Sequence, residues 1–275
     1  MKRYWQILRS QPRPVLFLLS RLLMRTGLCR LFLIRQQGFV LRFYPSALSA
    51  TLWMAPDDRH ADADFMRAYL RPGDVAIDVG ANIGSTALAA AAAVGERGRV
   101  IAFEPHPRTF RYLLGNLALN HAGNVRPHNL ALGEASGTVR FSNRGSDDQH
   151  SVVAGGDGIE VRVERLDGVL AGQGPIALLK IDVEGYERFV LQGAEGLLGG
   201  TACVYFEVDE AHFARHGYAT EDLLGLLRRA GYTILRLEEG RRVARVPAGF
   251  TATACENLIA VRSVPDFLRR TGFVG

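Results

Sequence analysis

The stretch Asp78-Val79-Gly80-Ala81-Asn82-Ile83-Gly84 decides the fold of this chain. It completes an apolar run that begins at Val75, and a helical pattern starts at Gly84, so it predicts a buried strand, a tight turn and a helix. Gly80 permits the turn, and Gly84 lets the helix approach the strand closely. The backbone N–H groups at the start of such a helix face a ligand, and Asn82 adds a side chain that can hydrogen-bond within the turn.

A second signal follows twenty residues beyond Gly84, where the next apolar run ends in Glu104. A carboxylate at the end of this strand is in position to accept hydrogen bonds from both ribose hydroxyls of a nucleoside cofactor. The glycine turn alone occurs in many α/β proteins for packing, and its pairing with Glu104 is what predicts a cofactor site. A nicotinamide fingerprint would need a second glycine where Asn82 stands, and a phosphate-binding P-loop would need a G-K-[ST] sequence that does not follow.

Apolar runs and helical patterns alternate over the rest of the chain, which predicts an α/β fold with a doubly wound, mostly parallel sheet. The expected strands are 75–79, 99–103, 125–130, 176–181, 203–207, 232–237 and 257–261, and the expected helices are 84–94, 107–119, 186–198 and 220–230. No helical pattern joins the last two strands, so one of these about seven strands should be antiparallel. Two further segments, 138–141 and 159–163, predict a strand pair around a polar loop, and 39–44 and 49–53 predict a hairpin of two short strands.

The N-terminal segment is basic and contains no acidic residue before Asp57. It carries 9 of the 33 basic residues of the chain, so the remaining 24 face 28 acidic ones and the body is slightly acidic. We therefore divide the chain into a helical and hairpin extension, residues 1–56, and a main domain, residues 57–275. Arginines interrupt the leucine-rich run 15–24 well short of the roughly 20 residues that a membrane span needs. No A-x-A-like cleavage site follows, which speaks against a signal peptide.

Three interpretations of this extension stay open. It is a helical cap on the main domain, or residues 1–35 make peripheral contact with an anionic membrane at its inner face, or it is an organellar transit peptide. The three cysteines, Cys29, Cys203 and Cys255, are odd in number and far apart, so they predict neither a disulfide framework nor a zinc site and favour a cytoplasmic location.

A second group of charged residues, Lys180, Asp182 and Glu184, surrounds the end of the expected strand 176–181. Strand alternation sends these three side chains to one side, where ligands bind in open α/β sheets. The alternative is an ion-pair network that only closes the entry to the next helix, with Glu184 and Glu187 near its N-terminus.

At this point the chain resembles the FkbM-type methyltransferases. The resemblance covers roughly residues 65–208 and is carried by motifs in the family's order and spacing: Asp78 to Gly84, Phe103-Glu104-Pro105, Asn116 to Asn120, Ala131 to Gly133, Leu166-Asp167 and Lys180 to Gly185. It implies a class I methyltransferase fold, S-adenosyl-L-methionine as the methyl donor, and a hydroxyl acceptor on a sugar, glycan or polyketide-like natural product. The expected cofactor-binding residues are Asp78, Gly80, Ala81, Asn82, Gly84, Glu104, Pro105, Asn129 and Leu130.

Methyl transfer to a hydroxyl group requires a base in addition to alignment of the reacting atoms. We expect Asp182 to be that base, Glu184 to assist it and Lys180 to position substrate or neutralise Asp182. Because an ordinary carboxylate is a weak base, His106 and His150 remain alternatives. Asp182 with Glu207 or Asp209 could bind Mg²⁺, but no spacing compels a metal site, and we predict none.

Two other function classes remain as alternatives to an O-methyltransferase: a nicotinamide-dependent oxidoreductase, and a catalytically silent cofactor-binding module carried to a membrane. Nucleic acid is a disfavoured partner because no stripe of basic and aromatic residues accompanies the acidic body. The sequence predicts neither the acceptor nor the oligomeric state.

Overall fold

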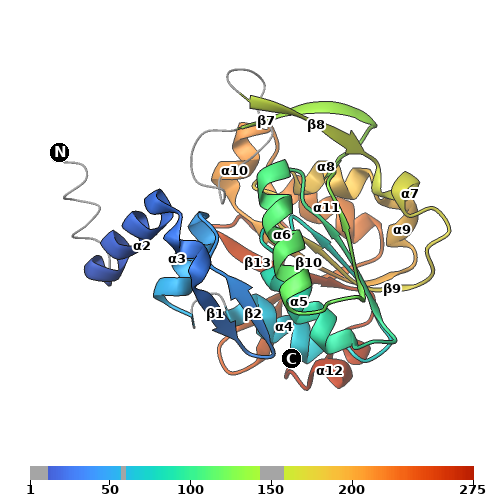
Figure 1. Ribbon diagram of the computed structural model, residues 1–275. Coiled ribbons are helices and arrows are strands. Elements are labelled where there is room, and N and C mark those ends of the chain that lie inside the picture. Colours follow the sequence, from blue (N-terminus) through green and yellow to red (C-terminus); the bar gives the residue numbers. More distant parts are fainter. Residues whose placement is uncertain (1–11, 57–59, 143–157) are drawn as a thin grey trace.

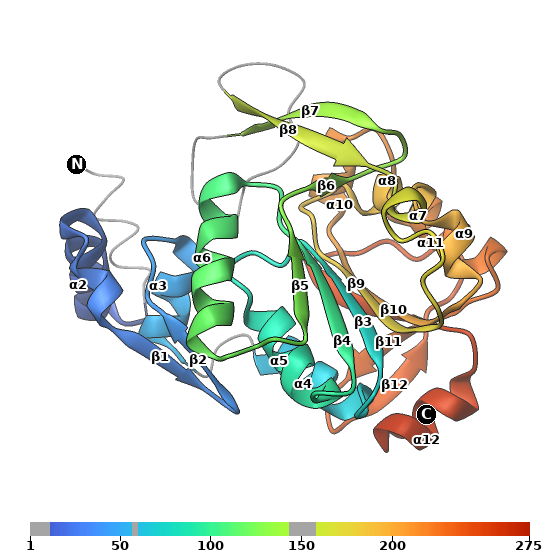
Figure 2. The same ribbon diagram turned by 45° about the vertical axis from the view of Figure 1, so that its right-hand side comes forward.

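A central sheet of eight strands organises the computed structural model, which describes residues 12–56, 60–142 and 158–275. Figures 1 and 2 show helices on both faces of this sheet. From one edge to the other, the strands are β12 (Arg242–Arg245), β11 (Thr233–Glu238), β13 (Glu256–Val261), β10 (Thr201–Val208), β9 (Ile176–Ile181), β3 (Val75–Val79), β4 (Arg99–Phe103) and β5 (Val125–His128). The strands from β10 to β5 are parallel, and β13 lies antiparallel between β10 and β11. The predicted doubly wound α/β fold is therefore confirmed.

Alternation along the strands divides the apolar core into two layers. In β3, Ala76 packs on one face, whereas Ile77 packs on the other. One layer contains side chains of α4 (His60–Tyr69), α5 (Ser85–Val94), α6 (Pro107–Leu119) and α12 (Val264–Thr271). The other contains side chains of α7 (Leu166–Val169), α8 (Glu187–Gln192), α9 (Glu195–Leu198), α10 (Glu210–Arg215) and α11 (Thr220–Arg229).

Two details of the sheet and its helices differ from the expectation. The strand β12 adds an eighth member and a third antiparallel pairing to the sheet. With four residues, two of them arginines, it is too short and too polar to stand out as an apolar run. The single helix expected over 186–198 is broken into α8 and α9 around Gly193. A Cβ at Gly193 would lie 2.0 Å from the carbonyl oxygen of Gly133, so the chain passes too closely there for any other residue.

A small three-stranded sheet stands over the carboxyl ends of the central strands, as both ribbon views show (Figure 2). It consists of β6 (Ala131–Leu132), β8 (Gly158–Glu164) and β7 (Gly137–Ser142). The pair β7 and β8 is antiparallel, which confirms the strand pair expected from the sequence. The loop between them, including His150, lies outside the described residues.

The described part of the N-terminal extension consists of α2 (Pro14–Thr26), the 3₁₀ turn η1 (Leu28–Leu31), the hairpin of β1 (Leu33–Gln36) and β2 (Phe39–Arg42), and α3 (Ala47–Met54). The prediction of a strand over 49–53 is wrong, because this segment is part of α3. Ser46 caps that helix by accepting a hydrogen bond from the Ser49 N–H at 3.0 Å. The hairpin partner of β2 is the preceding strand instead.

Two asparagines, Asn116 in α6 and Asn120 directly after it, attach this extension to the main domain. The side chains of Asn116 and Asn120 accept hydrogen bonds from the backbone N–H groups of Arg42 and Val40, each at 2.8 Å. The boundary at residue 56 remains a prediction. Within the described residues, no helix has the length and apolar character that crossing a membrane requires.

Candidate active site

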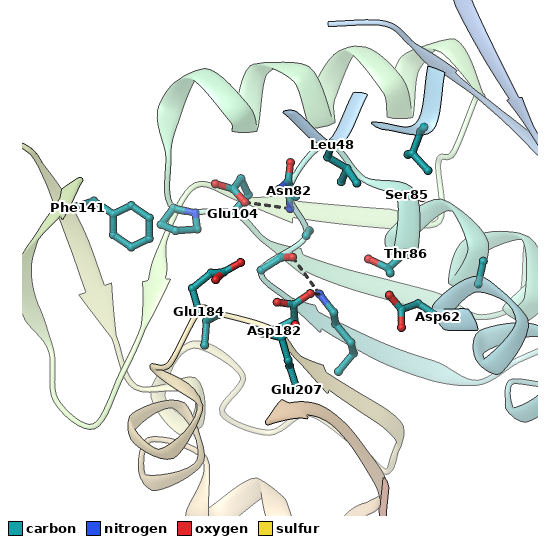
Figure 3. A pocket seen from close by; sticks show the side chains of 17 residues that line it. Leu48, Asp62, Asn82, Ser85, Thr86, Glu104, Phe141, Asp182, Glu184 and Glu207 are labelled. Carbon is teal, nitrogen blue, oxygen red and sulfur yellow. Dashed lines mark hydrogen bonds and ion pairs between the residues drawn. The ribbon is translucent and has the colours of Figure 1, made fainter. Parts of the chain in front are cut away.

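A cavity opens where β3, β4, β9 and β10 end, which is the edge of an open α/β sheet where ligands bind. Figure 3 shows the side chains that surround it. Its lining residues are Leu48, Leu52, Asp62, Ala63, Gly80, Ala81, Asn82, Ser85, Thr86, Glu104, Pro105, Phe141, Lys180, Asp182, Val183, Glu184 and Glu207. The glycine turn and the charged group at Lys180, far apart in the sequence, therefore share one cavity.

The turn after β3 is shaped by two close approaches. A Cβ at Gly80, whose φ is +80°, would lie 1.9 Å from the carbonyl oxygen of Asp182, so the turn and the loop after β9 touch backbone to backbone. A Cβ at Gly84, whose φ is +93°, would lie 2.6 Å from Leu113 on α6. Asn82 itself adopts a left-handed φ of +48°, a conformation that asparagine tolerates better than most residues. The positive φ favours glycine at both turn positions, and at Gly80 the backbone of Asp182 also leaves no space for a Cβ.

Glu104 ties the second strand to the glycine turn. Its carboxylate accepts hydrogen bonds from the backbone N–H groups of Asn82 and His106, both at 2.9 Å. Burial raises the pKa of Glu104 to about 7, against the lowering effect of those two hydrogen bonds. The carboxylate lines the cavity, as expected of a ribose-binding group. The buried Oδ1 of Asn82 has no hydrogen-bond partner among the described residues, which fits a ligand that donates a hydrogen bond here.

Lys180 lies between two carboxylates in the lining of the cavity. Its Nζ is 3.1 Å from Asp78 Oδ1 and 3.6 Å from Asp182 Oδ2, and it donates a hydrogen bond of 3.0 Å to the carbonyl oxygen of Gly80. Burial lowers its pKa, but Asp78 and Asp182 outweigh this effect and the net pKa is raised. Asp78 also accepts a hydrogen bond of 2.6 Å from Thr86. Lys180 therefore stays charged, and it holds the turn after β3 and the loop after β9 in place.

The loop after β9 is held by Glu187, at the first position of α8. Its Oε1 accepts hydrogen bonds from the N–H groups of Val183 at 2.9 Å and Gly185 at 3.4 Å. Glu184 has a left-handed φ of +57°, followed by Gly185 at +102°. A Cβ at Gly185 would lie 2.9 Å from the His212 carbonyl oxygen. The alternative role of closing the helix entry thus belongs to Glu187, while Glu184 lines the cavity.

Three carboxylates face the cavity from the loop after β9 and the end of β10 (Figure 3). Asp182 and Glu184 are partly exposed, with side-chain accessibilities of 34% and 27%. Burial and the nearby Asp182 carboxylate raise the pKa of Glu207 to about 7. The Nδ1 of His212 is 3.3 Å from Glu184 Oε2. Glu184, Glu207 and His212 each offer one ligand atom within 4.8 Å of the others, so this trio could hold a metal ion, although the sequence pattern did not single it out.

Eight of the predicted site residues line the cavity together: Gly80, Ala81, Asn82, Glu104, Pro105, Lys180, Asp182 and Glu184. Asp78 and Gly84 lie behind this lining, where they support the turn. Asn129 and Leu130 are not among the lining residues, and the Asn129 side chain donates hydrogen bonds to the carbonyl oxygens of Glu104 and Pro105. His106 caps α6 by accepting a hydrogen bond from the Arg108 N–H at 3.2 Å, and it does not line the cavity.

Several lining residues carried no motif in the sequence. Leu48 and Leu52 come from α3, and Phe141 comes from β7. Asp62, from α4, accepts hydrogen bonds from Tyr205 at 2.6 Å and Asn257 at 3.0 Å. These residues belong to segments that reach the cavity through tertiary packing, so only the folded chain brings them to the site.

Comparisons with known proteins agree with this geometry. The model of the methyltransferase FkbM domain matches residues 78–234. The hexuronic acid methyltransferase AglP of Haloferax volcanii is 30% identical over an alignment of 192 residues that covers 67% of this chain and 77% of that protein. The 31-O-demethyl-FK506 methyltransferase FkbM of Streptomyces tacrolimicus is 32% identical over 223 residues, covering 66% of this chain and 83% of that protein.

Among solved structures, a precorrin-6y C5,15-methyltransferase of Geobacter metallireducens superposes with a TM-score of 0.45 at 13% identity, over 75% of this chain and 90% of that one. This likeness is distant.

Proposed function

Since the chain belongs to the FkbM family of methyltransferases, we propose that it transfers a methyl group from S-adenosyl-L-methionine to a hydroxyl group of a sugar, glycan or polyketide-like natural product. The two relatives support these acceptor classes, because one is a hexuronic acid methyltransferase and the other a 31-O-demethyl-FK506 methyltransferase. The nicotinamide-dependent alternative has no support from the family, and Asn82 already disfavours it.

One observation carries the proposal. The glycine turn and Glu104 form one wall of the cavity, and the carboxylates of Asp182, Glu184 and Glu207 form the facing wall. A nucleoside cofactor held on the first wall would leave its reactive group between the two. An acceptor hydroxyl near the second wall would then lie close to a carboxylate that can accept its proton.

The cofactor wall offers complementary groups to a nucleoside. We assign Glu104 to the ribose hydroxyls, the backbone of Gly80 to Asn82 to close contact with the cofactor, and Asn82 Oδ1 to a hydrogen bond with it. Asp78 and Lys180 hold the turn through their ion pair rather than touching the reacting atoms. Pro105, Asn129 and Leu130 remain predicted cofactor contacts. The bound donor would supply a methyl group on a positively charged sulfur.

The acceptor wall supplies the base. A group with a pKa near the working pH is best suited to accept a proton in the transition state, and the pKa of Glu207 is raised to about 7. We propose that Asp182 and Glu207 act together on the acceptor hydroxyl and that Glu184, paired with His212, orients it. Lys180 limits the negative charge by its contact with Asp182. From the sequence, Asp182 was the expected base and Glu184 its assistant, and the raised pKa of Glu207 is the reason that Glu207 joins Asp182 in this proposal.

The proposed site of action is the cytoplasm. The three cysteines are free, and two of them, Cys29 and Cys203, are buried inside the protein. Unpaired thiols are typical of a reducing compartment.

The experiment is a panel of acceptors with purified protein. Incubation with S-adenosyl-L-methionine and, in turn, a hexuronic-acid saccharide, a neutral saccharide and a macrolide should yield S-adenosyl-homocysteine and a methylated product from one class. Asp182→Asn and Glu207→Gln should each lower kcat at least about 100-fold while cofactor affinity is retained. Glu96→Gln, at an exposed surface site, is the matched control.

Two results would contradict the proposal. Wild-type turnover in both carboxylate variants would remove these residues from the base role. Tight cofactor binding without turnover on any acceptor class would favour the catalytically silent module.

A further inference from the structure

The exposed apolar side chains of this protein are concentrated in one short segment. Ten large hydrophobic residues are exposed among the described residues, and eight of them lie between positions 15 and 33. They are Val15, Leu18, Leu19, Leu22, Leu28, Leu31, Phe32 and Leu33. We call this set the apolar patch. Its concentration is unusual, because exposed hydrophobic residues on soluble proteins are normally scattered singly.

The helix α2 shows how the patch is built. Phe17, Ser20 and Leu23 are buried, so one side of the helix packs on the protein, and α2 contacts α3. Val15, Leu18, Leu19 and Leu22 follow the spacing of one helical face, and they are 75%, 41%, 41% and 59% exposed. The helix lies at the periphery of the molecule, away from the central sheet (Figure 1). The patch is therefore an outward-facing surface that the described chain leaves uncovered.

The charge around the patch is of one sign. Arg13, Arg21, Arg25, Arg30 and Arg35 are exposed, and no acidic residue occurs before position 57. None of these five arginines forms an ion pair with an acidic side chain within the described parts of the chain. An apolar face bordered by arginines that have no acidic partner among the described residues complements a surface that is apolar inside and negatively charged outside.

We propose that the apolar patch and its arginines dock the enzyme peripherally on an anionic lipid bilayer. The leucines of α2 and the residues of η1 and β1 would enter the boundary between headgroups and acyl chains, and the arginines would lie at the level of the phosphates. A second copy of this chain is a poorer occupant, because a symmetric contact through the same patch would bring two sets of five arginines together without an acidic partner from the segment.

The test is flotation of the full-length protein with vesicles. Vesicles of phosphatidylcholine with phosphatidylglycerol should carry the protein upward, vesicles of phosphatidylcholine alone should carry at least about tenfold less, and about 0.5 M salt should release it. Leu18→Gln with Leu22→Gln should lower the partition coefficient at least about tenfold, because these side chains enter the lipid. Arg25→Gln with Arg30→Gln should lower it about tenfold or more.

Matched controls separate docking from unfolding. Leu114→Gln, at an exposed leucine on α6, and Arg97→Gln with Arg126→Gln, at exposed arginines away from the patch, should bind like the wild type. Equal binding to neutral and anionic vesicles would overturn the proposal, as would loss of binding in the controls. If the wild-type protein does not bind vesicles and forms a dimer, and the Leu18→Gln/Leu22→Gln variant is monomeric, the patch binds a second copy of the chain instead.

Discussion

Removing the charge of Lys180 should destabilise the protein strongly, because this side chain is the cation of a buried ion pair. The Lys180 and Asp78 side chains are only 4% and 5% exposed, and their charged atoms are 3.1 Å apart. Lys180→Met would leave Asp78 buried with only the hydrogen bond from Thr86. Breaking one partner of a buried pair costs about 3–5 kcal/mol, which is a large part of the stability of a typical domain.

Urea unfolding followed by circular dichroism measures this loss. With an m-value of about 2 kcal/mol/M, the midpoint of the Lys180→Met variant should fall by roughly 1.5–2.5 M. The double variant Lys180→Met/Asp78→Asn should recover part of the loss, since it removes both charges and keeps an acceptor for Thr86. Arg67→Met removes an exposed pair with Asp64 and should cost about 1 kcal/mol or less. A loss below about 1 kcal/mol in Lys180→Met, or strict additivity in the double variant, would refute the positioning role of Lys180.

Three further outcomes follow from the geometry of the cavity. Gly80→Ala should weaken S-adenosyl-L-methionine binding at least about tenfold in calorimetry, because its Cβ would meet the carbonyl oxygen of Asp182 at 1.9 Å and its φ is +80°; binding at wild-type strength would contradict the close approach. The folded-state pKa of Glu104 is raised to about 7, so its protonated form stabilises the free protein at low pH and that contribution fades as the pH rises through 7. Ribose hydroxyls donate to the ionised form, so cofactor affinity should rise between about pH 6 and 8, and Glu104→Gln should abolish that dependence. Chelation with EDTA should leave turnover unchanged; a loss that Mg²⁺ or Mn²⁺ restores would reassign Glu184, Glu207 and His212 to a metal site.

Much of the fold was predictable because its central half depends on local patterns. The run from Val75 to Glu104 alternates apolar strand, glycine turn and helix, and these elements form within one or two residues of the expected positions. The α6 helix matches its predicted bounds, Pro107 to Leu119. Here local propensity and burial favour the same structure.

The remainder depends on tertiary contacts that no local pattern shows. The segment 49–53 has the composition of a strand, yet the Ser46 cap and its packing make it helical. The break at Gly193 follows from the closeness of Gly133, which is sixty residues away in the sequence. In each case a contact between distant residues outweighs the local preference.

The candidate site also contains residues that the sequence predicted and residues that it did not. The motifs placed Gly80, Glu104 and Asp182 in one cavity because the ends of parallel strands meet at one edge of the sheet. Asp62 carried no signal of its own, since it reaches the cavity from α4. The sequence offered Glu207 only as a possible metal ligand, because its raised pKa comes from burial beside Asp182 in the folded chain. Only the folded chain shows which neighbours a carboxylate has.

We propose that this cavity binds S-adenosyl-L-methionine through Glu104 and the glycine turn. The most direct measurement is calorimetric titration of the purified full-length protein with S-adenosyl-L-methionine and, separately, with NAD. We expect saturable binding of S-adenosyl-L-methionine at one site per chain, loss of that binding in Glu104→Ala, and no binding of NAD. Saturable binding of NAD with none of S-adenosyl-L-methionine would contradict it.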